Sequence, residues 1–276
     1  MEMPKWPGNI QLANPLADVS DGIPLWILHG VFSSTGFSQI IRDKLQPPSP
    51  IYLLTQWGIE HEQVKSRSME ELVERYADAI IEHHPIDAPV PLLGYSAGGF
   101  ISLELARQLN LRGREVKVTV VDPAAEPVNV LRGTPSIPLF DTLEDQRKHF
   151  YEVQRLPPLS QFSTFTKTER ALKATIDLEV AKFSKTDAHR MLYYMLAQAQ
   201  MIAEYTPKPL ANTTTIKLLC TNSELEPDWR QEMQDARKLI CELSDNVTYH
   251  ELPGTHANVF VDREPLESML SHILRQ

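Results

Sequence analysis

The residues best suited to do chemistry lie at positions 94–98, where Gly-Tyr-Ser-Ala-Gly matches the pattern Gly-x-Ser-x-Gly. A short apolar run precedes the pattern and an amphipathic stretch follows it, so it predicts a sharp turn from a strand into a helix. Glycine on both sides of the serine avoids the clashes that side chains would make in so tight a turn. The turn places Ser96 at a helix N-terminus, where backbone N–H groups favour a developing negative charge. We predict that Ser96 is a nucleophile; the alternative is a turn whose serine only caps the helix.

A serine nucleophile needs a base, and nine histidines are available. His256 lies between the last predicted strand and the final predicted helix, where a loop at the carboxyl edge of the sheet is expected. His29 also ends a predicted strand, but it precedes the serine and is expected to shape the next loop. His83 and His84 follow a predicted helix and are expected to be solvated surface residues. Position therefore favours His256 as the base; the alternative is an ordinary loop histidine.

The base in turn needs an acid to orient it. Asp122 directly ends a predicted strand at the same sheet edge as Ser96. Asp228 is the second candidate, but it is expected to lie several residues into a loop after the following strand. We predict Asp122 as the acid; the alternative is a strand-end turn made with Pro123.

The oxyanion of a tetrahedral intermediate needs two N–H donors. One is expected from Ala97, directly after the nucleophile, and the other from the loop after the first long apolar strand. In that loop we predict Val31 as the donor. A plain strand-to-helix turn would contain the same small and polar residues.

The predicted elements alternate strand and helix, which is typical of a mostly parallel sheet with helices on both faces. A capping box at Ser68 and Glu71 opens the first predicted helix. A second predicted helix runs from Ala97 to about Leu109. The last runs from about Glu264 to Leu274. The predicted strands are 23–29, 51–55, 90–93, 116–121, 215–220 and 247–251.

Residues 124–205 break this alternation, with several prolines and helical rather than strand-like patterns. We interpret them as a helical insertion within one domain, 1–276, that forms a lid over Ser96. Its Met191, Tyr194 and Met195 would suit a flexible apolar substrate. The same side chains could equally pack the helices of the insertion against one another.

Composition excludes several classes of protein. Apolar residues make up 42% of the chain, enough for a sizeable core, and the net charge of −9 disfavours nucleic acid and anionic membranes as partners. Two cysteines cannot form a disulfide framework, and no Cys/His cluster has the spacing of a metal site. We find no signal peptide and no apolar run long enough to span a membrane. A cytoplasmic enzyme without a metal is therefore expected.

In these motifs the sequence resembles the thioesterase domains of nonribosomal peptide and polyketide synthases, which are α/β-hydrolases. The resemblance covers nearly the whole chain and is far more specific than Gly-x-Ser-x-Gly alone. It is carried by Ser68–Glu82 with Pro89–Gly99, Leu103–Gly113 with Val121-Asp122, Tyr205–Pro209, and Gly254-Thr255-His256.

The resemblance implies an α/β-hydrolase fold and an acyl, polyketide or peptidyl substrate. That substrate would be carried as a thioester on the phosphopantetheine arm of an acyl or peptidyl carrier protein, with no cofactor bound by the chain itself. Ser96 would take up the acyl group before hydrolysis or cyclisation. The placement of Asp122 resembles synthase-embedded members more than stand-alone editing members, and product release or editing both remain open. The rival functions are a general carboxylesterase or lipase with the same triad, and a hydrolase-like binding protein without catalysis.

Overall fold

The computed structural model describes a seven-stranded sheet in the order β1-β3-β2-β4-β5-β6-β7. All neighbouring strands run parallel except β1, which pairs antiparallel with β3. The described residues are 10–12, 22–28, 41, 50–54, 68–123, 201–202, 204–222, 227–256, 259–260 and 263–273. The strands are β1 (Ile10–Leu12), β2 (Leu25–Leu28), β3 (Ile51–Leu54), β4 (Val90–Tyr95), β5 (Val116–Val121), β6 (Thr215–Thr221) and β7 (Val247–Leu252).

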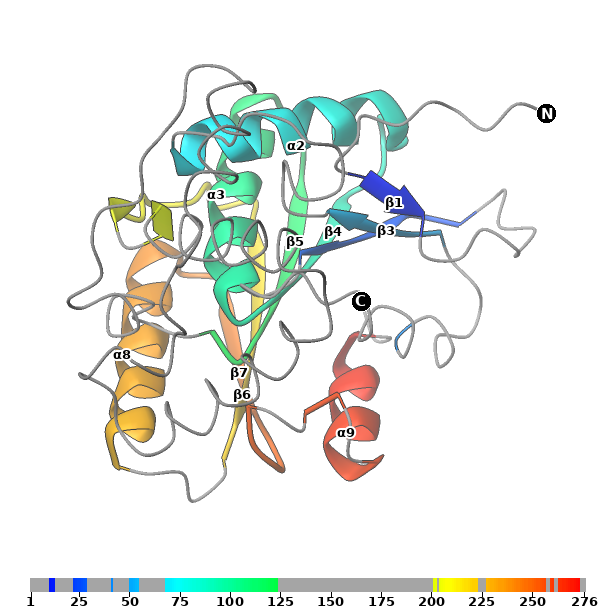
Figure 1. Cartoon of the computed structure of the whole chain (residues 1–276). Coiled ribbons are helices and arrows are strands. Elements are labelled where there is room, and N and C mark those ends of the chain that lie inside the picture. The colour runs from blue at the N-terminus through cyan, green and yellow to red at the C-terminus, as the bar shows by residue number, and fades with distance from the viewer. Residues whose placement is uncertain are drawn as a thin grey trace, which may run out of the picture.

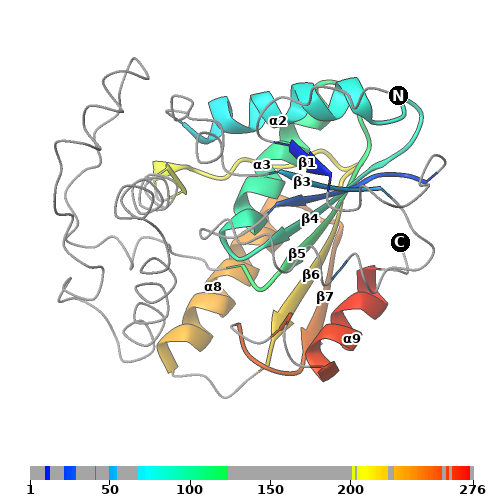
Figure 2. The ribbon, with the colours of Figure 1, turned by 45° about the vertical axis from the view of Figure 1, so that its right-hand side comes forward.

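Helices cover both faces of this sheet (Figures 1 and 2). The helices α2 (Met69–His83), α3 (Ala97–Leu111) and α8 (Pro227–Leu243) pack on one face, and α9 (Arg263–Ile273) packs on the other. Successive residues of β2 face opposite sides of the sheet. Trp26 lies in the core beneath α2 and α3, and Ile27 lies in the core beneath α9. Strands buried on both faces explain why the sequence shows continuous apolar runs instead of alternation.

The predicted parallel sheet with helices on both faces is confirmed, and most predicted elements lie within two residues of their predicted ends. The first helix begins where the capping box placed it, because the Ser68 hydroxyl accepts a hydrogen bond from the Glu71 N–H at 3.2 Å. Its apolar face is buried, from Met69 to Ile80.

Two elements were not predicted, β1 and α8. The expectation that Asp228 lies in a loop is wrong, because Asp228 belongs to the first turn of α8. Its neighbour Pro227 suits that place, since proline fits the first turn of a helix. The signal that could have identified this helix is a set of apolar residues at helical spacing. They are buried in the structure: Ala236, Ile240 and Leu243.

The expectation that His84 is a solvated surface residue is also wrong. Its side chain is buried, and its Nδ1 accepts a hydrogen bond from the Trp26 indole N–H at 3.1 Å. Its Nε2 lies 3.0 Å from the Pro89 carbonyl oxygen. Both ring nitrogens are satisfied if the imidazole is neutral and carries its proton on Nε2, so that Nε2 donates to Pro89. This single histidine ties the end of α2 to β2 and to the turn before β4.

His84 should make folding sensitive to mild acid. Burial lowers its pKa below the ordinary value of 6.5, and the nearby Arg114 charge acts in the same direction. The unfolded chain therefore binds this proton more readily than the folded chain, so the stability that neutral His84 contributes is lost as pH falls below 6.5. We expect the difference in free energy of unfolding between wild type and His84→Gln, from urea titrations, to shrink between pH 7.5 and pH 5.5. A difference that stays constant over this range would contradict the expectation.

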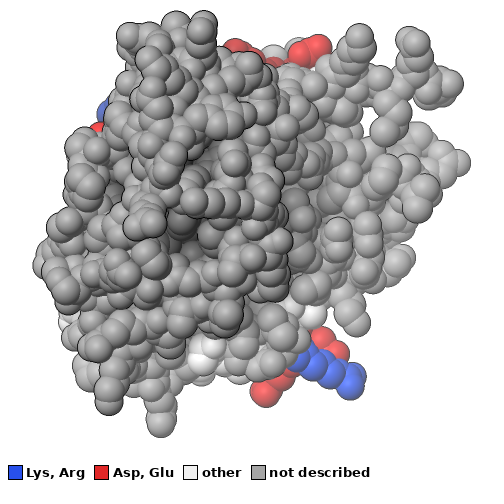
Figure 3. Space-filling view, viewed as in Figure 1, with Lys and Arg blue, Asp and Glu red and all other residues white. Residues whose placement is uncertain are grey.

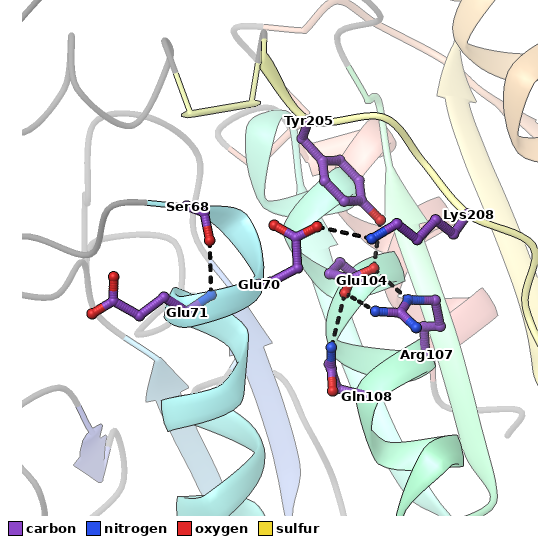
Figure 4. Close-up of polar contacts among 8 residues, drawn as sticks. All are labelled: Ser68, Glu70, Glu71, Glu104, Arg107, Gln108, Tyr205 and Lys208. Carbon is purple, nitrogen blue, oxygen red and sulfur yellow. Dashed lines mark hydrogen bonds and ion pairs between the residues drawn. The ribbon is translucent and has the colours of Figure 1, made fainter.

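A buried carboxylate fixes the segment that leads into β6 (Figure 4). Glu104 of α3 is fully buried and accepts two hydrogen bonds from the Arg107 guanidinium, at 2.6 and 2.8 Å. It also accepts one from Gln108 at 3.1 Å and one from the Tyr205 hydroxyl at 2.5 Å. Burial by itself would raise the pKa of Glu104, but these hydrogen bonds outweigh it and lower the pKa. The chain after position 204 is thereby held against α3, the helix that follows Ser96.

The predicted insertion, residues 124–205, lies outside the described residues except at its end. There Met201 and Ile202 are helical and buried in the core beneath α2 and α3. In the part of the chain that the structure describes, no helix is long and apolar enough to cross a membrane.

Candidate active site

Ser96 lies at the tight turn between β4 and α3. Its backbone has φ 54° and ψ −125°, a conformation that costs a non-glycine residue about 1–3 kcal/mol. Gly94 makes the turn possible, because a Cβ there would lie 2.3 Å from the Gly98 carbonyl oxygen. Gly99 lets the helix approach the sheet, because its Cβ would lie 2.8 Å from a Val120 methyl. The predicted strand-turn-helix context of the serine is therefore present.

The N-terminus of α3 directly follows this serine. Ala97 is the first residue of the helix, and N–H groups of a first helical turn have no partner within the helix. The Ser96 side chain makes no capping hydrogen bond, so it does not act as the helix cap. Val31, the other predicted N–H donor, lies outside the described residues, as does His29.

Asp122 lies at the end of β5, next to β4. Its side chain is fully buried, and it too has a positive φ, of 48°. It accepts hydrogen bonds from the backbone N–H and the hydroxyl of Thr221, both at 3.0 Å, at the end of β6. A buried carboxylate needs such partners to remain charged. Thr221 was not singled out from the sequence, although its place at a strand end of the same sheet edge was a usable signal.

His256 meets Asp122 across this edge. Its Nδ1 lies 2.8 Å from the Asp122 Oδ2, and the side chain is largely but not completely buried. Such a hydrogen bond leaves Nε2 as the ring nitrogen able to exchange a proton with a nucleophile. Sequence placed both residues correctly at the carboxyl edge, and the structure joins this pair. It does not place Asp228 in a strand-end loop.

Tyr95 connects this pair to the serine turn. It directly precedes Ser96, and its hydroxyl donates a hydrogen bond of 2.6 Å to the His256 carbonyl oxygen. The Ser96 N–H in turn donates to the Val121 carbonyl oxygen at 3.0 Å, beside Asp122. Residues far apart in sequence thus converge on the ends of four neighbouring strands, β4 to β7. Sequence analysis did not identify Tyr95, because the pattern leaves its position unspecified.

The remaining predictions for the site concern the lid and metals. Met191, Tyr194 and Met195 lie outside the described residues, so their place at the site stays a prediction. Among the residues that are described, no group of three or more His, Cys, Asp or Glu is arranged to hold a metal ion. The described site therefore consists of an alcohol, an imidazole and a carboxylate near a helix N-terminus.

Comparison with known proteins places this chain in a family. The chain is 25% identical to microperfuranone synthase of Emericella nidulans over an aligned region of 231 residues. That region covers 77% of this chain and 23% of the synthase. The thioesterase domain of NocB, solved as a covalent complex with a fluorophosphonate nocardicin G analogue, superimposes with a TM-score of 0.64 at 19% identity, covering 96% of this chain and 98% of the chain of that solved domain. The type II thioesterase YbtT of the yersiniabactin pathway superimposes with a TM-score of 0.63 at 16% identity, covering 97% of each chain.

The chain spans less than a quarter of the length of the first curated relatives. The match to the family model does not depend on the length of those relatives. The model describes a thioesterase domain and matches residues 24–276, which include Ser96, Asp122 and His256. The match therefore covers six of the seven described strands and leaves out only β1. This chain belongs to the thioesterase domain family.

Proposed function

We propose that this chain is a serine thioesterase that releases an acyl, polyketide or peptidyl chain from the phosphopantetheine thioester of a carrier protein. The observation that carries the proposal is the hydrogen bond between Asp122 and His256 at the strand edge where Ser96 lies on its strained turn. Membership of the thioesterase domain family supports the choice of a thioester as substrate.

In the first half of the proposed reaction, Ser96 is acylated. His256 takes the hydroxyl proton on Nε2 while the Ser96 oxygen attacks the thioester carbonyl carbon. Asp122 stabilises the imidazolium that forms. The N–H groups of Ala97 and Val31 would hold the oxyanion. The intermediate then collapses by breaking the carbon–sulfur bond, and the imidazolium gives its proton to the departing pantetheine thiolate.

In the second half, the acyl group leaves Ser96. Water, or a hydroxyl or amine within the acyl chain, gives a proton to His256 and attacks the ester carbonyl. Collapse of this second intermediate breaks the bond to the Ser96 oxygen, which recovers its proton from His256. Water gives a free acid and an internal nucleophile gives a ring. No cofactor of the chain's own is needed, because the thioester already carries the activation.

The carrier protein would have to dock on a chain whose net charge is −9. In the view of Figure 3, wherever basic side chains of the described residues are visible, acidic ones lie beside them. On α9, Arg263 forms an ion pair with Glu267 at 2.8 Å. Exposed pairs of this kind add little to affinity. The acyl chain and its pantetheine arm are therefore proposed to supply more of the recognition than the charges visible on this face.

The proposal is tested by comparing an acyl-pantetheine thioester with its oxygen-ester analogue. We expect kcat/KM for the thioester to exceed that for the oxygen ester by at least about tenfold. A fluorophosphonate should label Ser96, as peptide mass spectrometry would show. Faster hydrolysis of the oxygen ester would favour a general carboxylesterase, and absence of labelling at Ser96 would favour a binding protein.

A further inference from the structure

We propose that Tyr95 is a positioning residue for His256: its hydroxyl holds the backbone of the histidine and its ring holds the imidazole plane. The inference rests on the proposed function, in which His256 carries the proton. It assigns a role to the residue between Gly94 and Ser96, which the Gly-x-Ser-x-Gly pattern leaves free.

Three contacts carry the inference. The Tyr95 hydroxyl donates to the His256 carbonyl oxygen at 2.6 Å. The two rings stack, with centroids 4.9 Å apart and planes at 21°. Phe260 meets the Tyr95 ring edge-on, with centroids 4.7 Å apart and planes at 90°. The phenol therefore contacts His256 through both its hydroxyl and its ring.

The places of the two residues in the fold indicate that Tyr95 positions His256, and not the reverse. Tyr95 is the last residue of β4, and it is paired with Val121 in the middle of the sheet. His256 follows β7, an edge strand, and belongs to no helix or strand. A side chain fixed by the sheet can thus immobilise a residue of the loop. Asp122 fixes the imidazole at Nδ1 and the Tyr95 ring fixes its plane, which together set the direction of Nε2.

The Tyr95 hydroxyl keeps its proton in these surroundings. Burial, and then the charge of Asp122, raises the pKa of the Tyr95 hydroxyl, which therefore stays a neutral donor. Asp122 from β5 and Tyr95 from β4 are two titratable groups that contact His256. Cys220 of β6 lies near Asp122, but burial raises the pKa of its thiol to about 12, so it is neutral as well.

The experiment separates the hydroxyl from the ring. Tyr95→Phe removes only the hydrogen bond, and Tyr95→Leu removes the ring also. Tyr76→Phe is the matched control, because Tyr76 is a buried tyrosine of α2. Steady-state kinetics with an acyl-pantetheine thioester are measured from pH 5 to pH 9. In parallel, the mobility of the His256 imidazole is read by NMR relaxation in the Ser96→Ala background, which requires no turnover.

We expect Tyr95→Phe to lower kcat about five- to tenfold with KM unchanged, the effect of one lost hydrogen bond that positions a reacting group. Tyr95→Leu should lower kcat further and make the His256 imidazole more mobile, because the ring that holds its plane is lost. Tyr76→Phe should leave both the kinetics and that mobility unchanged.

The inference is overturned if kcat in Tyr95→Phe matches the control and the mobility of the His256 imidazole is the same in wild type and Tyr95→Leu. Tyr95 would then only pack the core. If Tyr95→Leu does not fold, Tyr95→Phe still decides the role of the hydroxyl, through kcat. Failure of the proposed function is a different result: the wild-type protein would then show no thioester turnover, whereas the NMR mobility of the imidazole would still report on the stacked ring.

Discussion

Ser96→Ala should abolish thioester turnover, with a loss in kcat of at least about 10⁴-fold, because it removes the atom that forms the acyl-enzyme. The change keeps the Cβ of the residue, so the cost of the positive φ at this turn stays the same. The Ser96 side chain makes no capping hydrogen bond to α3 that the variant would lose. We therefore expect the free energy of unfolding to stay within about 0.5 kcal/mol of wild type.

The measurement is single-turnover release of a thiol from an acyl-pantetheine, with urea unfolding of the same preparation. Ser271→Ala is the matched control, since Ser271 lies on α9, across the sheet from α3. It should keep activity within about twofold, as is usual for a surface substitution. A Ser96→Ala protein that is folded and retains more than about one per cent of wild-type turnover would rule out an acyl-serine path.

Asp122→Asn should lower kcat by about 10³- to 10⁴-fold while leaving KM nearly unchanged. The neutral amide cannot stabilise an imidazolium, and its NH₂ group favours the wrong tautomer of His256. The fold should survive, because Asn is nearly isosteric and its carbonyl oxygen can still accept the two hydrogen bonds from Thr221. Thermal unfolding checks that point separately from the kinetics.

Asp228→Asn is the matched control for the acid, since it makes the same chemical change in the first turn of α8. We expect its kcat to stay within about threefold of wild type. Should Asp228→Asn prove the more damaging of the two, the acid would be wrongly assigned, and the contact between Asp122 and His256 would be structural only.

Much of the framework could be predicted from sequence because its signals are local. Apolar runs without alternation indicate strands covered on both faces, and β2 to β5 follow them closely. The capping pattern at Ser68 places the start of α2 correctly. The serine turn is equally local, because the clash that excludes a side chain at Gly94 involves Gly98 and Ser102, which are close in sequence.

Two elements lacked a strong local signal. The three residues of β1 are too few to show a period, and they pair antiparallel with β3 from a distant part of the chain. Helix α8 begins with Pro227-Asp228, which in isolation favours a turn as much as a helix. Its buried stripe is spread over Ala236, Ile240 and Leu243, among many polar residues.

By itself the sequence determined the type of sheet, the strained serine and the set of side chains able to act with it, because strand ends and tight turns depend on neighbouring residues. Only the tertiary structure decided which acid meets His256, that Thr221 and Tyr95 take part, and that His84 is buried beside Trp26. These are contacts between residues on different strands and helices. Their partners are set by strand order and by packing across the sheet, which no local pattern encodes.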